Sequence, residues 1–322
     1  MKIFITRPIP EKGIHMLKAK GYDVVVNEAA ADRAATEEEM IAGATGATAI
    51  LPLLTDKVTA AVMDAGLPTL KIIANYAVGF NHVDMDAARA RNIFVTNTPG
   101  TNEPAVAEYT IGAMLNIARR LNEGDRATRA GKFNTWGMRD MMGDSIMGKT
   151  LGIVGLGKIG KQVAHMAEHG FEMTIVYQNT QQDDEFEKDH KATYCASLDA
   201  MLPLCDFVSL HVPLLDSTKH LMNVARLKLM KPSAFLINTS RGPVVDEQAL
   251  VDALKAGIIK GAALDVYEFE PQISPDLLKM ENVLLTPHIA AGTREVREKM
   301  SEVAATNIIE ALEGRAPPNL VQ

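Results

Sequence analysis

The sequence predicts an α/β protein of two domains, each a parallel β-sheet flanked by helices, with a cleft between them. Its 322 residues exceed the about 100–200 residues that one hydrophobic core usually serves. Hydrophobic residues make up 47% and charged residues 23%, as in ordinary globular proteins. Short β-rich runs alternate with helical stretches along the whole chain, which is the pattern of βα units.

Charge and hydropathy exclude several classes of partner. The chain has 40 acidic residues against 33 Lys and Arg, a net charge of -7, and no basic stripe. This argues against nucleic acid or an anionic membrane as the main partner. No apolar run approaches the about 20 residues of a membrane span, and the start of the chain is typical of a strand and a turn. We therefore expect a cytoplasmic protein that acts on a small molecule.

The sulfur-containing residues indicate packing rather than chemistry. Cys195 and Cys205 lie ten residues apart, without metal-ligand spacing, so we expect reduced, half-buried thiols and no metal site. Four methionines cluster along the middle of the chain, and they suit either a flexible site or, as we favour, a packed contact such as a subunit interface. They are Met138, Met141, Met142 and Met147.

The first hundred residues predict the strands of one sheet. These runs are Ile3–Thr6, Val24–Val26, Ala49–Leu51, Leu70–Ala74 and Ile93–Thr96. Thr36 followed by Glu39 has the form of a capping box, so the acidic run there predicts the first turn of a helix. After a break at Asn97–Gly100, a long apolar-periodic helix is expected over Glu103–Arg120, at a position suited to a hinge.

From Lys149 onward the strands become apolar on both faces. They are Leu151–Val154, Met173–Tyr177, Phe207–Val212, Ala234–Asn238, Ala262–Val266 and Val283–Thr286. Such strands, separated by helical segments, predict a parallel sheet that is covered on both sides. A last helix, from about Thr293 to Leu312, is expected to return to the first domain.

A glycine-rich loop follows the first of these strands. It reads Gly155-Leu156-Gly157-Lys158-Ile159-Gly160. The motif alone is weak evidence, since a glycine turn needs no ligand, but the buried strand before it and a helix over Ile159–His169, ending at Gly170, make it specific. Gly157 lets backbone N–H groups approach a pyrophosphate at the helix N-terminus. The loop therefore predicts a nicotinamide-dinucleotide site.

The next strand ends where the adenosine ribose of such a cofactor would lie. Gln178, followed by Asn179 and Thr180, stands 18 residues beyond Gly160, near the expected position of an acidic residue. A neutral residue there removes the repulsion that excludes a 2′-phosphate, whereas an Arg that would bind one is missing. The sequence thus favours NADP(H), with NAD(H) tolerated.

Three polar residues follow strands at the edge where open α/β sheets bind ligands, namely Arg241, Glu270 and His288. Arg241 can hold a substrate carboxylate bidentately, although an Arg before Gly-Pro can equally brace a loop. Glu270 and His288, taken singly, are also consistent with a solvated carboxylate and a satisfied loop histidine. Together they indicate carbonyl reduction, because an imidazolium held by a carboxylate supplies the required proton.

Several ordered motifs now carry a family resemblance that spans nearly the whole chain. Together with the glycine loop they resemble the D-isomer-specific 2-hydroxyacid dehydrogenases, and the segment from Asn75 to Asp84 is most similar to the glyoxylate and hydroxypyruvate reductase branch. The other motifs are Asn238–Gly242, Ala263–Val266, Glu270-Pro271 and Thr286–His288.

The resemblance implies roles for these residues. Arg241 would anchor the substrate carboxylate and carbonyl, Glu270 would orient the histidine, and His288 would act as general acid in reduction and as base in oxidation. The substrate domain, flavodoxin-like, would comprise residues 1–99 and 288–322. The dinucleotide-binding Rossmann domain, residues 100–287, would be inserted between them.

The resemblance also implies binding residues. Leu53 and the backbone of Val78 and Gly79 would contact the substrate, with Leu54, Phe80, Trp136 and Met138 as further pocket candidates. Asp265 would hold the nicotinamide carboxamide, unless it is a loop cap. His211 and His220 are interpreted as structural or surface residues. The remaining cofactor contacts would be Thr110, Val212, Pro213, Thr218, Thr239, Ser240, Arg241, His288 and Gly292.

A segment around Gly131–Trp136 resembles the family's dimerisation arm, which would span about 121–148. We call residues 121–148 the arm, and we expect a homodimer. The one tryptophan, Trp136, would then lie at a subunit contact, whereas a core position within one chain remains open.

The expected function is reduction of a small 2-oxo acid, such as glyoxylate or hydroxypyruvate, to the D-2-hydroxy acid. Two alternatives stay open. A phosphoglycerate dehydrogenase-like enzyme would need basic residues for the phosphate, and a nucleotide-sensing, corepressor-like binding protein would need no turnover. The intact set of Arg241, Glu270 and His288 favours an enzyme.

Overall fold

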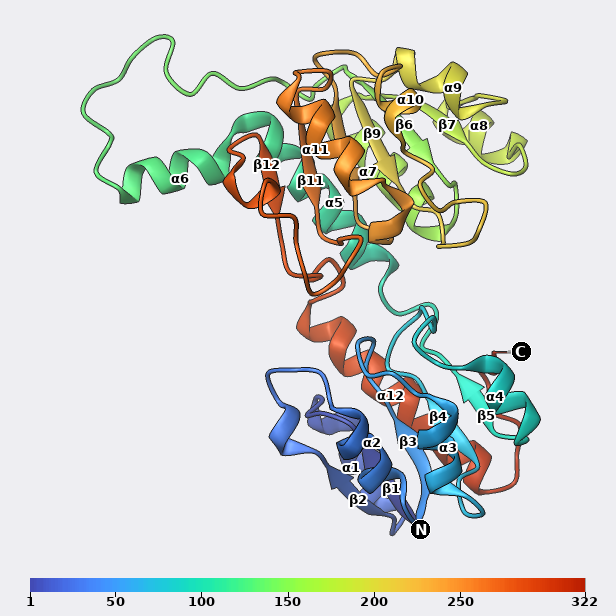
Figure 1. Ribbon diagram of the computed structural model, residues 1–322. Helices are drawn as coiled ribbons and strands as arrows, with labels where there is room; N and C mark the ends of the chain where they lie inside the picture. The colour runs from blue at the N-terminus through green and yellow to red at the C-terminus, as the bar shows by residue number, and fades with distance from the viewer. Residues whose placement is uncertain (322) are drawn as a thin grey trace. The chain divides into compact units, whose positions relative to one another are not determined.

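A computed structural model describes residues 1–321 and divides the chain into two compact units (Figure 1). The first unit comprises Met1–Asn102 and the segment that begins at Gly292; the second comprises Glu103–Ala291. The divisions lie within a few residues of the domain boundaries expected from the sequence. His288 falls in the second unit, however, and Gly292 falls in the first.

The first unit is a five-stranded parallel sheet in the order β2-β1-β3-β4-β5. Its strands are β1 (Lys2–Ile5), β2 (Asp23–Val26), β3 (Ala47–Leu51), β4 (Ile72–Ala74) and β5 (Phe94–Thr96). This is the flavodoxin-like order, in which the strand order reverses between β1 and β3. Ligands bind outside the carboxyl ends of the strands at such a point.

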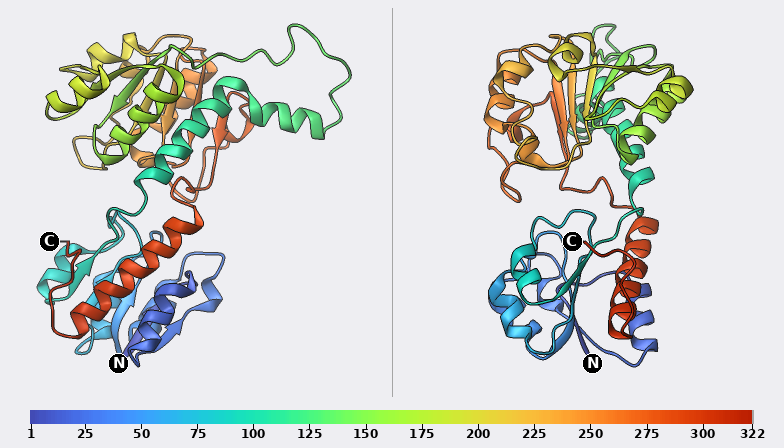
Figure 2. Two further views of the ribbon diagram at one scale, coloured as in Figure 1. Left: turned by 180° about the vertical axis from the view of Figure 1, so that it is seen from behind. Right: turned by 90° about the vertical axis from the view of Figure 1, so that its right-hand side faces the viewer.

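Helices cover both faces of this sheet. They are α1 (Glu11–Ala19), α2 (Glu37–Ala44), α3 (Ala60–Gly66), α4 (Met85–Ala90) and α12 (Arg294–Leu312), with the short 3-10 helix η1 (Glu28–Ala30). Figure 2 shows α12 and α1 side by side on one face and α3 and α4 on the other. The predicted capping box begins α2: the Thr36 side chain accepts from the Glu39 N–H, and the Glu39 carboxylate accepts from the Thr36 N–H.

The second unit is a seven-stranded parallel sheet in the order β12-β11-β10-β9-β6-β7-β8, the Rossmann arrangement. All six predicted strands are present, and a seventh, β8, was missed. A strand of two residues at the edge of the sheet is too short to leave a pattern in the sequence. The strands are β6 (Thr150–Val154), β7 (Thr174–Gln178), β8 (Thr193–Tyr194), β9 (Phe207–Leu210), β10 (Phe235–Asn238), β11 (Gly261–Leu264) and β12 (Val283–Leu285).

Alternate strand residues of this sheet pack into two separate hydrophobic clusters. Val208 faces one cluster with Leu250 of a flanking helix, whereas Phe207 faces the other with Met114 and Val163. Both faces are therefore covered, as the apolar strands predicted. The helices are α5 (Glu103–Arg119), α6 (Leu121–Arg129), α7 (Lys158–Phe171), α8 (Asp184–His190), α9 (Leu198–Met201), α10 (Val224–Leu227) and α11 (Glu247–Lys255), with 3-10 helices η2 (Leu202–Leu204), η3 (Gly242–Val244) and η4 (Leu277–Lys279).

Two helix ends differ from the prediction. α7 continues through Gly170 to Phe171 and is terminated by Glu172, which adopts the left-handed conformation at φ 53°. α5 ends at Arg119 because Arg120 is also left-handed, at φ 56°. Left-handed residues commonly end helices, and they are most often glycine. The sequence therefore gave no signal at either position.

One expectation about single side chains was wrong, and one open alternative is excluded. Cys195 and Cys205 are free thiols, as expected, but they are buried rather than half-buried. Trp136 is 80% exposed, so it is not a core residue of this chain. The four clustered methionines are also exposed. These residues lie on or beside the irregular segment that follows α6 and projects from the body of the second unit (Figure 1).

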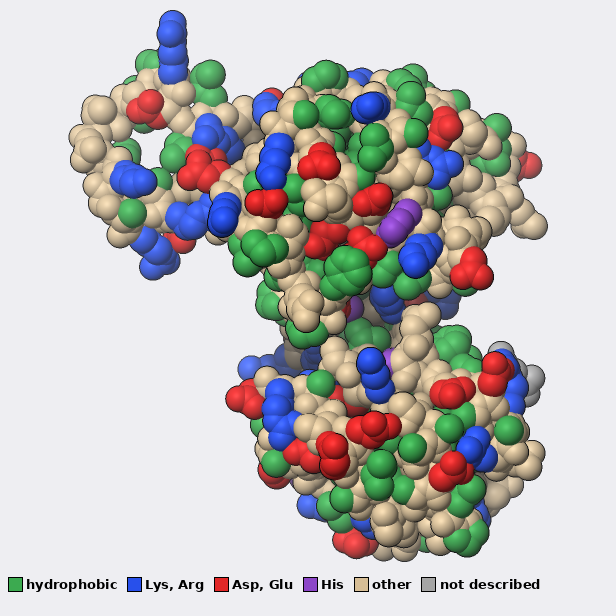
Figure 3. All heavy atoms as spheres, viewed as in Figure 1, with side chains coloured by type: hydrophobic (Ala, Val, Ile, Leu, Met, Phe, Trp, Pro, Cys, Tyr) green, Lys and Arg blue, Asp and Glu red, His purple; other side chains and the backbone are tan. Residues whose placement is uncertain are grey.

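The surface carries acidic and basic side chains intermixed, on the face seen in Figure 3. Among residues 1–321, no helix combines the length and the apolar character that a membrane crossing requires.

Candidate active site

The glycine loop joins β6 to α7 as predicted. Gly155 adopts φ 94°, and a Cβ there would lie 2.9 Å from the backbone of His211. A Cβ on Gly160 would lie 2.3 Å from the Gly155 carbonyl oxygen. Both glycines are thus required, the first by its left-handed backbone and the second by the close approach of helix and loop.

The N-terminus of α7 is open for an anion. Gly157 is its N-cap, no side chain caps the helix, and a Cβ at Gly157 would meet no atom within 4 Å. The first N–H groups of a helix have no intrahelical acceptor, and the helix dipole favours negative charge there. These features fit the pyrophosphate of a dinucleotide.

Gln178 ends β7 at the sheet position next to the loop, where its carbonyl oxygen accepts from the Gly155 N–H at 2.9 Å. Its side-chain amide donates to the Asn179 carbonyl oxygen at 3.2 Å. The nearest ion pair in this connection joins Lys161 of α7 to Asp183 at 2.5 Å, and this hydrogen bond lowers the pKa of Asp183. The Lys161 side chain of α7, which reaches this connection, therefore already has a carboxylate partner.

Other predicted cofactor residues of this unit line up along the carboxyl ends of its strands. Val212 and Pro213 follow β9, and Thr239 and Ser240 follow β10. The Thr239 hydroxyl lies 3.2 Å from that of Thr110 on α5. The structure thus brings residues from distant parts of the sequence to one edge of the sheet, as the resemblance implied.

Two of these side chains brace their own loops. Thr218 donates to the Pro213 carbonyl oxygen at 2.6 Å and accepts from the Leu215 N–H at 2.8 Å. The Ser240 N–H and hydroxyl both donate to the Asn238 side chain, at 3.0 and 2.8 Å. Their side chains are therefore occupied within the loops that the cofactor would contact.

Asp265 is buried and acts as a loop cap. Its carboxylate accepts from the N–H groups of Ile289 and Ala290, at 2.8 and 2.7 Å, and from the Thr286 hydroxyl at 2.7 Å. A loop cap was the alternative that the sequence left open for this residue. The three bonds hold the chain in place before and after His288.

His288 and Glu270 form a pair. The His288 Nδ1 lies 3.0 Å from the Glu270 Oε2, and the two side chains are 30% and 26% exposed. The Tyr267 N–H donates to the other Glu270 oxygen at 2.9 Å. His288 adopts φ 56°, an uncommon conformation for a residue with a side chain, and one that is concentrated at functional sites.

The ionisation of the site follows from its contacts. Burial acts to raise the pKa of Glu270, but the hydrogen bond and charge of His288, the Tyr267 N–H and the charge of Arg241 together leave that pKa lowered. Burial lowers the pKa of Arg241, and the charge of Glu270 partly offsets this effect. The guanidinium stays protonated nevertheless. Glu270 is therefore an anion beside a permanent cation.

Arg241 and Glu270 line the same cavity. It has a volume of about 400 Å³ and is bounded by Arg241, Gly242, Pro243 and residues 267–272. The Arg241 guanidinium donates to the Ser240 carbonyl oxygen at 2.7 Å, which holds the side chain at its own strand end. The second unit thus contains a histidine, its carboxylate partner and a guanidinium that lines the same cavity as that carboxylate.

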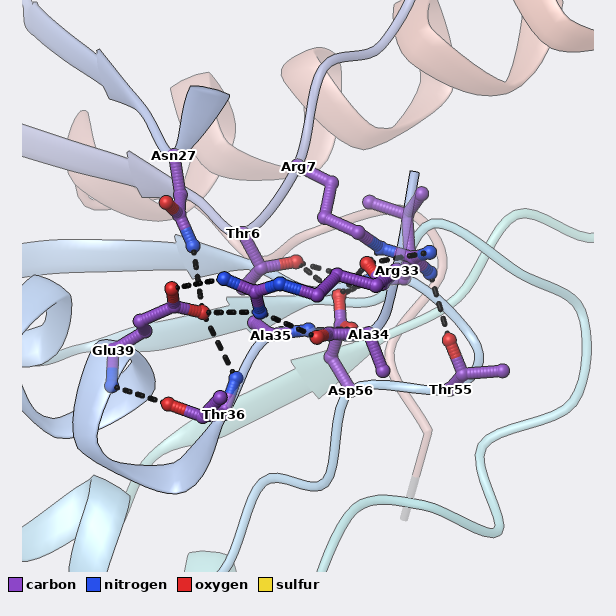
Figure 4. Close-up of polar contacts among 11 residues, drawn as sticks. Thr6, Arg7, Asn27, Arg33, Ala34, Ala35, Thr36, Glu39, Thr55 and Asp56 are labelled. Carbon is purple, nitrogen blue, oxygen red and sulfur yellow. Dashed lines mark hydrogen bonds and ion pairs between the residues drawn. The ribbon is translucent and has the colours of Figure 1, made fainter. Parts of the chain in front are cut away.

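The predicted substrate residues belong to the first unit. Leu53 follows β3 at the point where the strand order reverses, and its N–H donates to Asp56 at 3.2 Å. Asp56 is buried and also accepts from the Thr6 hydroxyl, the Ala35 N–H and Arg7 (Figure 4). This network fixes the loop that carries Leu53.

Val78 and Gly79 lie in the loop after β4. Their carbonyl oxygens accept from side-chain amides: Asn97 donates to Val78 at 2.8 Å, and Asn75 donates to Gly79 at 2.8 Å. With the carbonyls held in this way, the N–H groups are the parts of this backbone that can bind an anion.

Sequence reasoning missed two tyrosines that support the catalytic loop. Tyr267 donates its N–H to Glu270 and its hydroxyl to the Thr286 carbonyl oxygen at 2.8 Å, and the Tyr109 hydroxyl contacts the Thr286 hydroxyl. No sequence signal could have found them, because the Thr286 groups that their hydroxyls contact lie 19 and 177 residues away in the chain. His211 and His220 are structural: Ser209 and Glu268 are their respective partners, at 2.8 and 2.6 Å.

The sequence is similar to those of known dehydrogenases. Residues 111–290 match the model of the D-isomer specific 2-hydroxyacid dehydrogenase, NAD binding domain. A glyoxylate reductase from Thermofilum pendens is 46% identical over 323 residues, which cover 99% of this chain and 94% of that protein.

Two solved structures show the same fold. The TT0316 protein from Thermus thermophilus superposes with a TM-score of 0.93 at 39% identity, covering all of both chains. An NADPH-dependent glyoxylate/hydroxypyruvate reductase from Sinorhizobium meliloti, solved with NADP and malonate, has a TM-score of 0.84 at 32% identity and covers 99% of this chain and 96% of its own. The chain therefore belongs to the D-isomer specific 2-hydroxyacid dehydrogenases, which are NAD(P)-dependent oxidoreductases.

Proposed function

We propose that this enzyme reduces a small 2-oxo acid, with glyoxylate and hydroxypyruvate as the preferred candidates, to the D-2-hydroxy acid. The observation that carries the proposal is the His288–Glu270 pair in the same unit as Arg241 and the glycine loop. Both groups that such a reduction needs are there, a proton donor and a cation for a carboxylate. Two relatives described above, a glyoxylate reductase and a glyoxylate/hydroxypyruvate reductase, agree with this substrate class.

His288 is the proposed general acid. A bound nicotinamide would supply the hydride. Because Nδ1 faces Glu270, the Nε2–H is free to protonate the carbonyl oxygen, and the same nitrogen removes the proton in the reverse direction. Glu270, ionised through its contacts, fixes the ring and stabilises the imidazolium.

Arg241 is the proposed anchor. Its guanidinium binds the substrate carboxylate and stabilises the negative charge that develops on the carbonyl oxygen. The Val78 and Gly79 N–H groups contribute to carboxylate binding, and Leu53 contacts the substrate. Positioning of this kind supplies a large part of catalysis.

The proposed cofactor contacts are those implied by the family. The N-terminus of α7 binds the pyrophosphate, and the strand-end residues bind the remainder. We assign Gly155, Gly157, Lys158, Ile159, Gly160, Gln178, Asn179, Thr180, Thr110, Val212, Pro213, Thr218, Thr239, Ser240, Asp265 and Gly292 to this role. Asp265 would contact the cofactor through a carboxylate that its loop bonds already hold in place.

NADP(H) is the proposed preferred cofactor. Gln178 is neutral, so no carboxylate at the end of β7 repels a 2′-phosphate, and a relative at 32% identity is NADPH-dependent. The connection from β7 to α8 offers no Arg to bind such a phosphate. NAD(H) should therefore also be used, with lower efficiency.

Initial rates would test the proposal directly. Glyoxylate, hydroxypyruvate, pyruvate and 3-phosphohydroxypyruvate would each be supplied with NADPH and with NADH. We expect the highest kcat/KM for glyoxylate or hydroxypyruvate with NADPH. A preference for 3-phosphohydroxypyruvate would instead favour the phosphoglycerate dehydrogenase-like alternative. Cofactor binding without turnover of any of the four acids would favour a nucleotide-sensing binding protein.

A further inference from the structure

Three histidines gather on the surface of the second unit, and none of them is assigned above to substrate or cofactor. His165 and His169 lie one turn apart on α7, and His190 is the last residue of α8. Each histidine has one ring nitrogen that lies within 4.8 Å of a ring nitrogen of each of the other two. Residues four apart share a helix face, so two ligands come from one helix and the third from its neighbour.

The hydrogen bonds of the rings leave nitrogen atoms available. The His190 Nδ1 lies 2.7 Å from a Glu168 carboxylate oxygen, so its Nε2 is the free atom. The His169 Nδ1 lies 3.1 Å from the His165 carbonyl oxygen, which likewise leaves Nε2. A metal-binding histidine usually donates its other ring N–H to a carboxylate or carbonyl, and these are the two arrangements seen.

The donor set selects a class of metal. Three imidazoles suit Zn²⁺, Cu²⁺ and Ni²⁺, whereas Mg²⁺ and Ca²⁺ require oxygen ligands. Three histidines with a water molecule complete a tetrahedral zinc site, with Zn–N bonds of about 2.0–2.1 Å. The His169 side chain is 58% exposed, and His165 is also exposed, so both rings can turn inward to that distance.

We propose that His165, His169 and His190 form a binding site for a divalent transition metal ion of the Zn²⁺ class, with Glu168 orienting His190 from the outer sphere. The bound ion fastens the end of α8 to α7. The start of α8 is already fastened, because Lys161 of α7 pairs with Asp183, the N-cap residue of α8. Without metal, the end of α8 is held by the Glu168 hydrogen bond and by contacts of the His190 ring with the His165 and His169 rings, whose centroids lie 5.3 and 5.7 Å from it.

There is a physical reason why the sequence did not predict this metal site. His165 and His169 have the spacing of helical ligands, but the third ligand is 21 residues further along the chain. Only the packing of α8 against α7 brings it to the pair. The cysteines, which are the usual signal, lie elsewhere and are buried.

Calorimetric titration of the full-length chain, without an affinity tag and stripped with a chelator, would test the site. We expect ZnCl₂ to bind at one ion per chain. His165→Gln, His169→Gln and His190→Gln should each weaken binding by at least about tenfold, and Glu168→Gln should weaken it by about tenfold. His15→Gln is the matched control, since His15 is an exposed helical histidine of the first unit; it should bind zinc as the wild type does.

Thermal unfolding gives a second readout. Saturating Zn²⁺ should raise the Tm of the wild type and of His15→Gln, but not that of His165→Gln, because only ligand binding to the native state stabilises it. His165 and His169 are exposed, so their variants should fold, as circular dichroism would verify. The absence of saturable binding to the wild type, or full binding by both His165→Gln and His169→Gln, would overturn the proposal.

Discussion

At the scale of single residues, Asp265 shows that a sequence can indicate a functional position without indicating the hydrogen bonds that the residue makes there. The family resemblance assigned Asp265 to the cofactor, with a loop cap as the alternative. Its three hydrogen bonds to Thr286, Ile289 and Ala290 could not be read in advance, because they depend on how a segment more than twenty residues downstream returns to the sheet. The same holds for the Tyr267 hydroxyl, whose partner, the Thr286 carbonyl oxygen, is 19 residues downstream.

The three proposed catalytic residues were identifiable because each follows a strand. Arg241, Glu270 and His288 occupy positions where open α/β sheets bind ligands, and the structure brings Glu270 within hydrogen-bond distance of His288. The left-handed backbone of His288 was not identifiable, since nothing in Thr286-Pro287-His288 requires it. The succession of strands predicts where such residues lie, but it does not predict the backbone conformation that orients their side chains.

His211 gives a pH prediction at this scale. Burial lowers its pKa from 6.5 to about 4, so between these values the unfolded chain binds a proton that the folded chain does not. The stability contributed by neutral His211 is complete above pH 6.5 and is lost as the pH falls toward 4, by up to about 3 kcal/mol.

Urea unfolding of the wild type and of His211→Gln between pH 4.5 and 7.5 would measure this contribution. The free energy of unfolding should fall less steeply with decreasing pH in the variant. His15→Gln, which changes an exposed histidine, should leave the slope as it is in the wild type. Equal slopes for the wild type and His211→Gln would show that the ring is not held neutral by burial.

At the scale of elements, the strand, glycine loop and helix from β6 to α7 were predicted almost completely. The apolar run, the three glycines and the helical pattern all agreed on one structure. The prediction failed where local signals were weak, at the two-residue edge strand β8 and at Glu172, which ends α7 in place of a glycine. Tertiary packing decides such positions, and packing has no short-range pattern.

The connection after β7 determines the proposed cofactor preference. In Gln178→Asp, a carboxylate would stand beside the 2′-phosphate of NADPH, and we expect kcat/KM for NADPH to fall by about tenfold or more while that for NADH is maintained or rises. Gln181→Asp adds the same charge three residues along the same connection and should have a smaller effect. Equal losses with both cofactors in Gln178→Asp would contradict the assigned role of this position.

At the scale of the whole molecule, the sequence predicted two α/β units from its βα rhythm, and the two sheets have the flavodoxin-like and Rossmann orders. What it could not predict is how the arm packs. Phe133, Trp136 and Met138 are 72%, 80% and 77% exposed in the single chain. We propose, as the family implies, that the arm joins two copies in a homodimer, which would bury these side chains.

The single tryptophan makes this assembly measurable. If the arm of one copy packs against the other, Trp136 is buried in the dimer, and its fluorescence emission should shift to longer wavelength on dilution as size-exclusion chromatography shows dissociation. Trp136→Ser should weaken the dimer. A monomer at all concentrations, or a dimer whose Trp136 emission stays that of a fully exposed indole, would disprove the proposed role of the arm.

The most direct test of the proposed mechanism is the NADPH-dependent reduction of glyoxylate by His288→Asn. Asn is among the residues that most readily adopt the left-handed backbone, so the loop held by Asp265 should keep its conformation. We predict that kcat falls by about 10²–10⁴-fold, the usual contribution of general acid catalysis, while the Kd for NADPH stays within about twofold of the wild-type value. A variant that retains wild-type kcat would contradict the account.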